Sequence, residues 1–329
     1  MSARRDTVCR LGLPYALLAL LATVASCGSD GENADEEAEI GESGGSLGSG
    51  GADAASGGAD AASGGADTGA GGTTPQPTSG CDAASWPDNG RYTIDVGGTT
   101  REYVFTAPAG YDASTPMKLI FVWHGLGGTI DNMDSQFWGY YGMANINDGS
   151  AILAAGQGLG TADDPTAYAW RNTDGEDVAF VRALIDWFNA NFCIDAARIF
   201  STGMSYGGVM SNTVGCELGD LVRAIGPIAG AGPGFGSFGG PNCVGQVASI
   251  LVHGTADDVV TFDMGESSRD HWLEANHCGT GTTPVDPTEY CVAYSGCDAG
   301  FPVHWCVHDG GHTIPDFSAQ AIWDFFAQF

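Results

Sequence analysis

The sequence predicts an α/β domain over residues 81–329, built on a mostly parallel sheet that is covered by helices. Two observations lead to this prediction. Short, continuous apolar runs alternate in this range with segments of helical periodicity, as expected when strands are buried on both faces. Every cysteine after Cys27 also lies in this range, whereas the segment before it lacks the large apolar residues that build a core.

Residues 1–26 are typical of a secretory signal peptide, because three arginines precede an apolar run over 11–26. That run is shorter than the roughly 18 to 20 residues that a spanning helix needs. Small residues at its end directly precede Cys27 and resemble a bacterial lipoprotein signal. We therefore expect cleavage before Cys27 and lipidation of its thiol; the alternative is an ordinary signal peptide cleaved near Ser26.

The segment 27–80 is predicted to be a flexible linker. It is rich in Gly, Ala, Ser and Asp, and the unit Gly-Gly-Ala-Asp-Ala-Ala-Ser begins at Gly50 and again at Gly57. The seven-residue period does not indicate a coiled coil, since each unit has two glycines and no large apolar residue. We expect this linker to tether the domain to a membrane surface through the lipidated Cys27.

The charge of the chain excludes some partners. The formal net charge is −29, and Lys118 is the single lysine. Such a chain cannot present a cationic surface to phosphates, so nucleic acid and anionic lipid headgroups are not expected as partners. The hydrophobic content of 43% is nevertheless sufficient for a sizeable core.

The elements of the domain follow from the apolar pattern. Alternating residues over 91–96 and 101–105 flank Gly97 and Gly98, which predicts a hairpin. The continuous apolar runs that follow predict buried strands at 119–123, 151–155, 199–200, 224–228 and 248–252. Helical patterns lie between and after them, at 178–192, 206–216 and 319–329.

The cysteines of the domain indicate an exported, disulfide-bonded protein. Their number is even, which allows four disulfides without fixing the pairs. No two of them are separated by two residues, and the histidines are not interleaved at ligand spacing, so we expect no metal site. The eight candidates for disulfides are Cys81, Cys193, Cys216, Cys243, Cys278, Cys291, Cys297 and Cys306.

Ser205 is the candidate nucleophile. It is the central residue of Gly203-Met204-Ser205-Tyr206-Gly207, a G-x-S-x-G motif. Ser43 and Ser46 satisfy the same motif within the linker, so the pattern alone has little meaning in this composition. Only Ser205 follows a predicted strand and precedes a predicted helix, the context in which a strained turn exposes the hydroxyl above the sheet.

A serine hydroxyl needs a base and an acid, which follow it in the order Asp and then His in this type of fold. Asp257 lies in a loop after the strand at 248–252, and Asp258 is its nearest rival. His312 lies in a glycine-flanked loop before the last helix. His304 and His308 are its competitors, and their alternative placement is on an edge strand over 302–308.

A glycine-rich turn after the strand at 119–123 is the candidate oxyanion loop. In His124-Gly125-Leu126-Gly127-Gly128, backbone N–H groups can point at the oxygen that becomes charged during attack. We favour the N–H of Leu126, with Gly127 as the alternative. The N–H of Tyr206, directly after the nucleophile, is the expected second donor.

Together these motifs resemble carbohydrate esterase family one, the group of α/β-hydrolases that contains feruloyl esterases, acetyl xylan esterases and polyhydroxybutyrate depolymerases. The resemblance extends from about Arg91 to Phe329, and its cysteine-rich part is particularly similar to the feruloyl esterase branch. In place of the tryptophan that often follows Gly-Gly-His-Thr, this chain has Ile314, which concerns the shape of the pocket. The matching segments are 121–128, 156–159, 170–172, 177–181, the Ser205 and Asp257 loops, 310–312 and 291–306.

The resemblance implies hydrolysis of esters through an acyl-enzyme, without a cofactor. Ser205 attacks, His312 transfers the proton, and Asp257 orients the imidazole. Trp170 and Trp305 are candidates for the wall of an acyl pocket, with core packing as the alternative for both, and His124 is a further candidate for substrate binding. We expect the enzyme to be a monomer that is extracellular or at the cell surface, with its lipid anchor in the outer membrane.

The substrates expected from the resemblance are esters of plant cell-wall polysaccharides, with feruloyl esters favoured. A polyester substrate, as for a polyhydroxybutyrate depolymerase, or an acetylated xylan is the alternative in the same class. A non-catalytic binding lipoprotein is a remote alternative, because a binding module has no need for nucleophile, acid, base and oxyanion loop together.

Overall fold

The computed structural model describes residues 74–135, 139–161, 163–233, 243–285, 287 and 289–329. The predicted signal peptide, Cys27 and nearly all of the predicted linker lie outside the described residues. Within the described part, no helix has both the length and the apolar character that crossing a bilayer requires.

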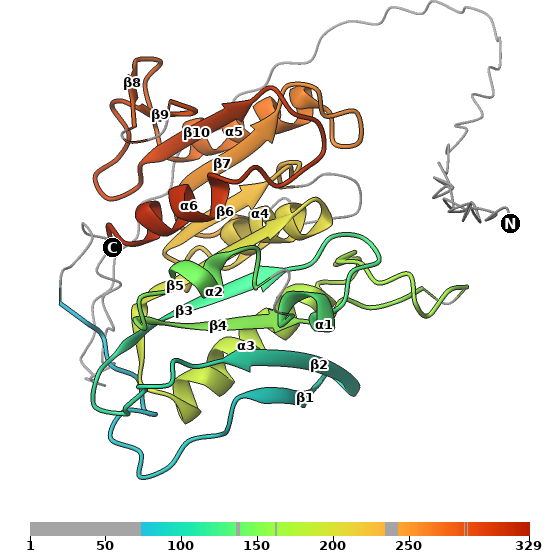
Figure 1. The fold of residues 1–329 in the computed structure, drawn as a ribbon, viewed down its shortest axis with the longest axis vertical. Coiled ribbons are helices and arrows are strands. Elements are labelled where there is room, and N and C mark those ends of the chain that lie inside the picture. The colour runs from blue at the N-terminus through green and yellow to red at the C-terminus, as the bar shows by residue number, and fades with distance from the viewer. Residues whose placement is uncertain (1–73, 136–138, 162, 234–242, 286, 288) are drawn as a thin grey trace, which may run out of the picture. The chain divides into compact units, whose positions relative to one another are not determined.

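The domain is organised around one sheet, in which ten strands are described in the order β1-β2-β4-β3-β5-β6-β7-β10-β9-β8 (Figure 1). The strands from β4 to β10 pair in parallel, whereas β1 and β2 at one edge and β9 and β8 at the other pair antiparallel. The bounds are β1 Gly90–Val96, β2 Thr99–Thr106, β3 Met117–Trp123, β4 Ala151–Gly156, β5 Ile194–Met204, β6 Ala224–Ile228, β7 Ala248–Gly254, β8 Thr282–Pro284, β9 Cys291–Tyr294 and β10 Val303–His308.

Helices cover both faces of this sheet. The helices are α1 Ile130–Met133, α2 Met143–Ile146, α3 Glu176–Asn191, α4 Tyr206–Glu217, α5 Phe262–Ala275 and α6 Ser318–Phe326. Buried side chains of α3, α4 and α5 belong to one apolar cluster, and those of α1, α2 and α6 belong to another. The fold is therefore a three-layer α/β arrangement, which confirms the predicted fold class.

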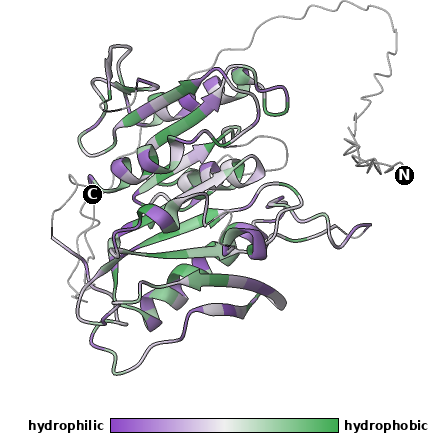
Figure 2. Cartoon of the chain, viewed as in Figure 1, coloured by the Kyte–Doolittle hydropathy of each residue, from purple (hydrophilic) through white to green (hydrophobic). Residues whose placement is uncertain are grey.

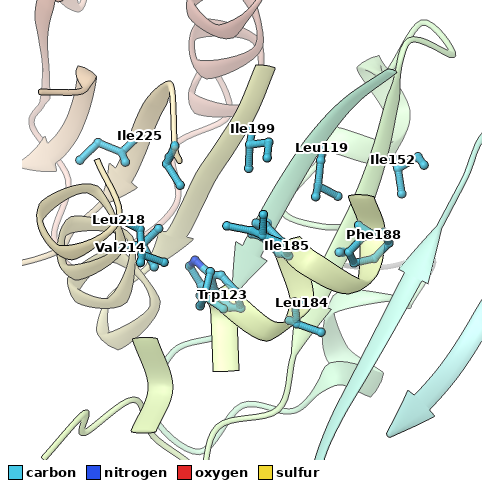
Figure 3. Close-up of a cluster of buried hydrophobic side chains, with 14 of the residues drawn as sticks. Leu119, Trp123, Ile152, Leu184, Ile185, Phe188, Ile199, Val214, Leu218 and Ile225 are labelled. Carbon is cyan, nitrogen blue, oxygen red and sulfur yellow. The ribbon is translucent and has the colours of Figure 1, made fainter. Parts of the chain in front are cut away.

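The two clusters meet the sheet through alternate residues of the same strands. On β3, Leu119 and Trp123 face the cluster beneath α3 and α4, while Ile120 and Val122 between them face the cluster beneath α6. Figure 3 shows the first of these clusters, with Leu119, Trp123 and Ile185 side by side. Because both faces are buried, the central strands are apolar along their length, as the green colour of β3 and β4 shows in Figure 2.

Several elements differ from the expectations. The hairpin at 91–105 is confirmed, and the five buried strands are all present. The strand predicted at 199–200 begins at Ile194, and its first residues include the polar Asp195 and Arg198, which pair with each other and do not fit a continuous apolar run. The strand with His304 and His308 is not an edge strand, since β10 lies between β7 and β9.

The contacts of the domain begin before Cys81. The N–H of Gln76 donates to Asp195 Oδ1 at 2.8 Å, and Thr78 Oγ1 donates to the Phe192 carbonyl at 3.0 Å. Gly80 is buried so tightly against Phe192 that a Cβ at this position would overlap the backbone. Residues 76–80, which their composition assigned to the linker, therefore pack on the domain.

All eight cysteines of the domain form disulfides, as the even number indicated. Cys291–Cys306 joins β9 to β10, and Cys81–Cys193 joins the start of the domain to the residue before β5. The remaining pairs are Cys216–Cys243 and Cys278–Cys297.

Candidate active site

Ser205 occupies a sharp turn between β5 and α4. Its backbone has φ 59° and ψ −121°, a conformation that costs a residue with a side chain about 1–3 kcal/mol. The N–H of Ser205 donates to the Ile228 carbonyl at 2.9 Å, which holds the turn against β6. The strand-turn-helix context that distinguished Ser205 from Ser43 and Ser46 is therefore present.

The two glycines of the motif are required by close packing. A Cβ at Gly207 would collide with the Trp123 carbonyl oxygen at the end of β3, and one at Gly203 would lie 2.7 Å from the same oxygen. Both distances are shorter than any real Cβ contact, so only glycine allows α4 to begin directly against β3 and β5. This close approach fixes the direction in which Ser205 points.

His312 connects Ser205 with Asp257. Its Nε2 lies 2.8 Å from Ser205 Oγ, and its Nδ1 lies 2.8 Å from Asp257 Oδ2. A carboxylate only accepts, so we assign the proton of the neutral imidazole to Nδ1, which leaves the lone pair of Nε2 to accept from the hydroxyl. The Asp257 side chain is fully buried, whereas the His312 side chain is 15% exposed, so a substrate can reach the histidine.

The turn after β7 places Asp257 rather than Asp258 at this position. Asp257 Oδ1 accepts from the N–H groups of Val259 and Val260 at 2.9 and 3.0 Å. Its other oxygen, Oδ2, is thereby aimed at His312. Asp258 is exposed to solvent instead.

The two competing histidines have other surroundings. His304 is buried against the Phe325 ring of α6, and desolvation lowers its pKa from 6.5 to about 4. His308 Nδ1 accepts from the Gly310 N–H at 3.1 Å, so this ring supports the loop that leads to His312. Desolvation lowers the pKa of His308 as well, although Asp309 and Asp257 oppose the shift.

His253 is a residue of this site to which sequence reasoning assigned no role. It lies near the end of β7, and its Nε2 is 2.8 Å from the Val260 carbonyl oxygen and 3.4 Å from Asp257 Oδ2. A signal was present in the sequence, because His253-Gly254 at the end of β7 has the same form as His124-Gly125 after β3.

The loop after β3 is held by the His124 side chain, which is fully buried. Its Nδ1 lies 2.7 Å from the Gly125 carbonyl oxygen, and its Nε2 accepts from the Gly158 N–H at 3.0 Å. Desolvation lowers the pKa of His124 to about 4, although the bond to Gly125 opposes the shift. His124 is therefore neutral and carries its proton on Nδ1.

Two N–H groups of this loop differ in their partners. The N–H of Gly127 donates to the Tyr168 carbonyl at 2.8 Å. For the N–H of Leu126, by contrast, the described residues provide no acceptor. Gly125 lies beside the nucleophile, since a Cβ placed on it would be 3.5 Å from Ser205 Cβ.

The three residues expected to bind substrate are buried in this structure. Trp170 is fully buried, and its Nε1 donates to the His124 carbonyl at 2.9 Å. Trp305 is 5% exposed and lies beneath α5, where the Arg269 guanidinium is 5.5 Å from its ring. Both tryptophans and His124 thus support the loops around the site, and the core-packing alternative describes the two tryptophans.

Exposed apolar side chains are instead found on the loops themselves. Leu126 is 63% exposed and directly follows Gly125, and Val259 is 59% exposed two residues after Asp257. Two cavities of about 270 and 460 Å³ lie elsewhere, and neither is lined by a residue of the Ser205-His312-Asp257 group. No group of three or more His, Cys, Asp or Glu side chains suited to a metal ion occurs among the described residues.

Several curated proteins are similar to this chain. No family model matches the chain. Feruloyl esterase D of Neurospora crassa is 33% identical over 274 residues, which cover 77% of this chain and 91% of that protein. Feruloyl esterase C of Emericella nidulans is 35% identical over 240 residues, which cover 69% of this chain and 83% of that protein.

A solved structure matches the fold. An acetyl xylan esterase from Aspergillus awamori superposes with a TM-score of 0.58 at 14% sequence identity, over 72% of this chain and 98% of that chain. This likeness confirms the α/β-hydrolase fold. Four disulfides, which form in oxidising compartments, agree with an extracellular protein.

The match covers 91% and 83% of the length of the two fungal enzymes and shows the family of the chain. The chain belongs to the feruloyl esterases of carbohydrate esterase family one and is a carboxylic ester hydrolase.

Proposed function

We propose that Ser205, His312 and Asp257 form a catalytic triad that hydrolyses feruloyl esters of plant cell-wall polysaccharides through an acyl-enzyme. The observation that carries this proposal is the position of His312, with one ring nitrogen 2.8 Å from Ser205 Oγ and the other 2.8 Å from Asp257 Oδ2. A hydroxyl, a base and a buried acid in one line are the parts that nucleophilic ester cleavage needs.

The first half of the reaction forms the acyl-enzyme. As Ser205 Oγ bonds to the ester carbonyl carbon, its proton moves to His312 Nε2 and the carbonyl oxygen becomes negatively charged. Asp257 remains ionised and stabilises the imidazolium. When the carbon–oxygen bond to the alcohol breaks, His312 Nε2 returns the proton to the leaving oxygen.

The second half releases the acid. His312 Nε2 accepts a proton from a water molecule whose oxygen attacks the acyl carbon, and the proton then returns to Ser205 Oγ as the acyl bond breaks. The products are the free carboxylic acid and the regenerated hydroxyl. No cofactor takes part in either half.

The N–H groups of Leu126 and Tyr206 are the proposed donors to the oxyanion. Gly127 is the weaker candidate, because its N–H is already bonded to the Tyr168 carbonyl. Tyr206 is the first residue of α4, so the positive end of the helix dipole adds to its N–H.

Leu126 and Val259 are the proposed apolar contacts of the acyl group. They replace Trp170 and Trp305 in this role, since both tryptophans are buried beneath the loops. Few large apolar side chains are exposed among the described residues, and of these Leu126 follows Gly125, which lies near Ser205, while Val259 is two residues after Asp257. An acyl group bound there contacts exposed side chains rather than the buried core.

The direct test of the triad is Ser205→Ala, assayed by release of ferulate from methyl ferulate. We expect kcat/KM to fall by roughly 10⁴- to 10⁶-fold while the melting temperature stays near that of the wild type. Ser46→Ala is the matched control, because it removes the serine of another G-x-S-x-G motif. Retained activity in Ser205→Ala would refute the triad.

The acyl contacts are tested by Leu126→Ser and Val259→Ser. Loss of one exposed apolar contact should raise KM for methyl ferulate by several-fold, on the order of 1 kcal/mol, and change KM for an acetyl ester much less. Val244→Ser is the control, because Val244 is also exposed but lies away from Ser205. Val244 contacts the carboxyl end of α4, whereas Ser205 precedes its amino end. Equal effects on both esters would contradict the assignment.

Assays of the wild-type protein on other esters distinguish the competing functions. Clearing of a polyester suspension without release of ferulate would favour a polyhydroxybutyrate depolymerase, and release of acetate alone from acetylated xylan would favour an acetyl xylan esterase. A binding lipoprotein without activity would release no acid from any of them.

The proposed setting is a lipid-anchored enzyme at the cell surface that acts as a monomer. The anchor rests on the resemblance of the residues before Cys27 to a lipoprotein signal. A monomer is favoured because a single chain provides the nucleophile, base and acid. Cys27→Ser should move the protein from the membrane fraction to the medium, and size-exclusion chromatography tests the oligomeric state.

A further inference from the structure

His253 lies beneath the Asp257 turn and is 1% exposed. Its Nε2 is 2.8 Å from the Val260 carbonyl oxygen. A carbonyl only accepts hydrogen bonds, so Nε2 must carry the ring proton. The same N–H lies 3.4 Å from Asp257 Oδ2, the oxygen that also binds His312.

Val260 is therefore held from two sides. Its N–H donates to Asp257 Oδ1 at 3.0 Å, while its carbonyl accepts from His253 at 2.8 Å. These two hydrogen bonds connect His253, near the end of β7, through Val260 to the Asp257 carboxylate. The direction of the carboxylate thus depends on a chain of contacts that starts at the His253 ring.

We propose that His253 is a positioning residue of the triad, which holds the Asp257 turn through Val260 and keeps Asp257 Oδ2 aimed at His312 Nδ1. Because His253 acts on the proposed acid, this role rests on the proposed function. The ring does not reach Ser205, and its effect on the reaction passes through Asp257.

The surroundings of His253 fit an imidazole closely. Gly265 of α5 lies against the ring, and a Cβ at that position would overlap Nδ1. The Phe262 and Trp305 rings each lie 6.2 Å from it, centre to centre. The ring therefore has little freedom to turn away from Val260 and Asp257.

The charge state of His253 suits this role. Burial lowers its pKa, and His312 and His308 act in the same direction, whereas the Val260 bond and Asp257 oppose the shift. A neutral His253 leaves the negative charge of Asp257 to the imidazolium that His312 becomes during catalysis. A charged ring at this position would compete for it.

The test compares His253→Leu with His253→Gln in the full chain. Leucine removes the donor, whereas glutamine keeps an N–H near the position of Nε2. We expect His253→Leu to lower kcat by up to about 100-fold with little change in KM, as misplaced catalytic groups do. His253→Gln should recover most of this loss.

The pH profile of kcat/KM gives a readout that packing alone would not change. The nearby titratable groups are Asp257, His312 and His308, with Arg269 beyond the Trp305 ring. The aligned Asp257 carboxylate stabilises the imidazolium of the base, so its misalignment should move the acid limb of the His253→Leu profile to lower pH. His253→Gln should keep the limb near the wild-type position.

His304→Leu is the matched control, because His304 is also a buried histidine with a lowered pKa but packs against Phe325 of α6. It should lower the melting temperature without moving the acid limb. Equal losses in kcat for His253→Leu and His253→Gln with an unmoved limb, or wild-type kcat in His253→Leu, would overturn the positioning role. Ser205→Ala is assayed in parallel, since activity in that variant would instead refute the triad itself.

Discussion

Two His-Gly pairs lie at the same end of the parallel strands β3 and β7, which β5 and β6 separate in the sheet, and they use their histidines in opposite ways. After β3, His124 Nε2 accepts from the Gly158 N–H, and near the end of β7, His253 Nε2 donates to the Val260 carbonyl. Both rings are buried, and burial lowers the pKa of both. The backbone group that each ring meets therefore selects its tautomer, and each ring stabilises one loop of the site.

The glycines that follow the two histidines also differ. A Cβ on Gly254 would collide with the Gly310 carbonyl oxygen and lie 2.6 Å from that of Gly311, in the loop of His312. A Cβ on Gly125 would meet its nearest neighbours at 3.4 Å, an ordinary contact. The β7 pair is thus packed against the His312 loop, whereas the β3 pair has room beside Ser205.

The largest expected effect comes from Gly254→Ala, which should push the His312 loop away from Ser205. We expect kcat/KM to fall by roughly 100-fold and the free energy of unfolding to fall by about 1–3 kcal/mol, as for overpacked sites. Gly125→Ala is the comparison variant, and its melting temperature should stay near that of the wild type. If the two alanine variants behaved alike in kinetics and melting, the contrast between the pairs would be lost.

An intermediate effect is expected for His124→Leu, which leaves the buried Gly158 N–H without its acceptor. Such a loss costs about 1–3 kcal/mol in the free energy of unfolding, measurable by urea denaturation. His124→Gln retains an acceptor and should lose less. The two histidines differ as described if His124→Leu loses mainly stability while His253→Leu loses mainly kcat. Equal stability of His124→Leu and the wild type would contradict the structural role of His124 in the loop after β3.

The smallest expected effect is a dependence of stability on pH. The pKa of His124 falls from 6.5 to about 4 on folding, so below pH 6.5 the unfolded chain binds a proton that the folded chain does not. The free energy of unfolding should therefore fall as the pH is lowered from 6.5 towards 4, by about 1 kcal/mol over the first unit.

His304 has the same pKa and acts in the same direction. Denaturation at pH 6.5 and 5.5 should show a smaller change in His124→Gln than in the wild type. A variant that loses as much stability as the wild type over this interval would show that His124 is not the group that titrates.

The sequence predicts most strongly where a motif coincides with the end of a strand. Ser205, Asp257 and His312 follow β5, β7 and β10, and parallel strands bring their carboxyl ends to one edge, so order along the chain already implies proximity. The fold class followed from the same alternation of elements. The sequence favoured Leu126 but left Gly127 open as the proposed oxyanion donor, because the choice depends on which of the two N–H groups meets the Tyr168 carbonyl.

Other features depend on contacts that the sequence does not contain. Trp170 and Trp305 are aromatic and close to site residues in sequence, but their depth is set by the loop and by α5 above them. The interior position of β10 depends on β9 and β8, which are short; β9 is partly buried and β8 is exposed. The pairing of eight cysteines likewise required the strand register that brings Cys291 opposite Cys306.

The Cys81–Cys193 disulfide determines how tension would travel through the domain. Cys193 directly precedes β5, a central strand, whereas β1 and β2 follow Cys81 and form the sheet edge. A pull on the chain ahead of residue 81 is therefore transmitted to the start of β5 through a covalent bond. It does not separate the β1-β2 hairpin from the edge of the sheet. The force would therefore enter the sheet at the end opposite to Ser205, Asp257 and His312, which follow the carboxyl ends of β5, β7 and β10.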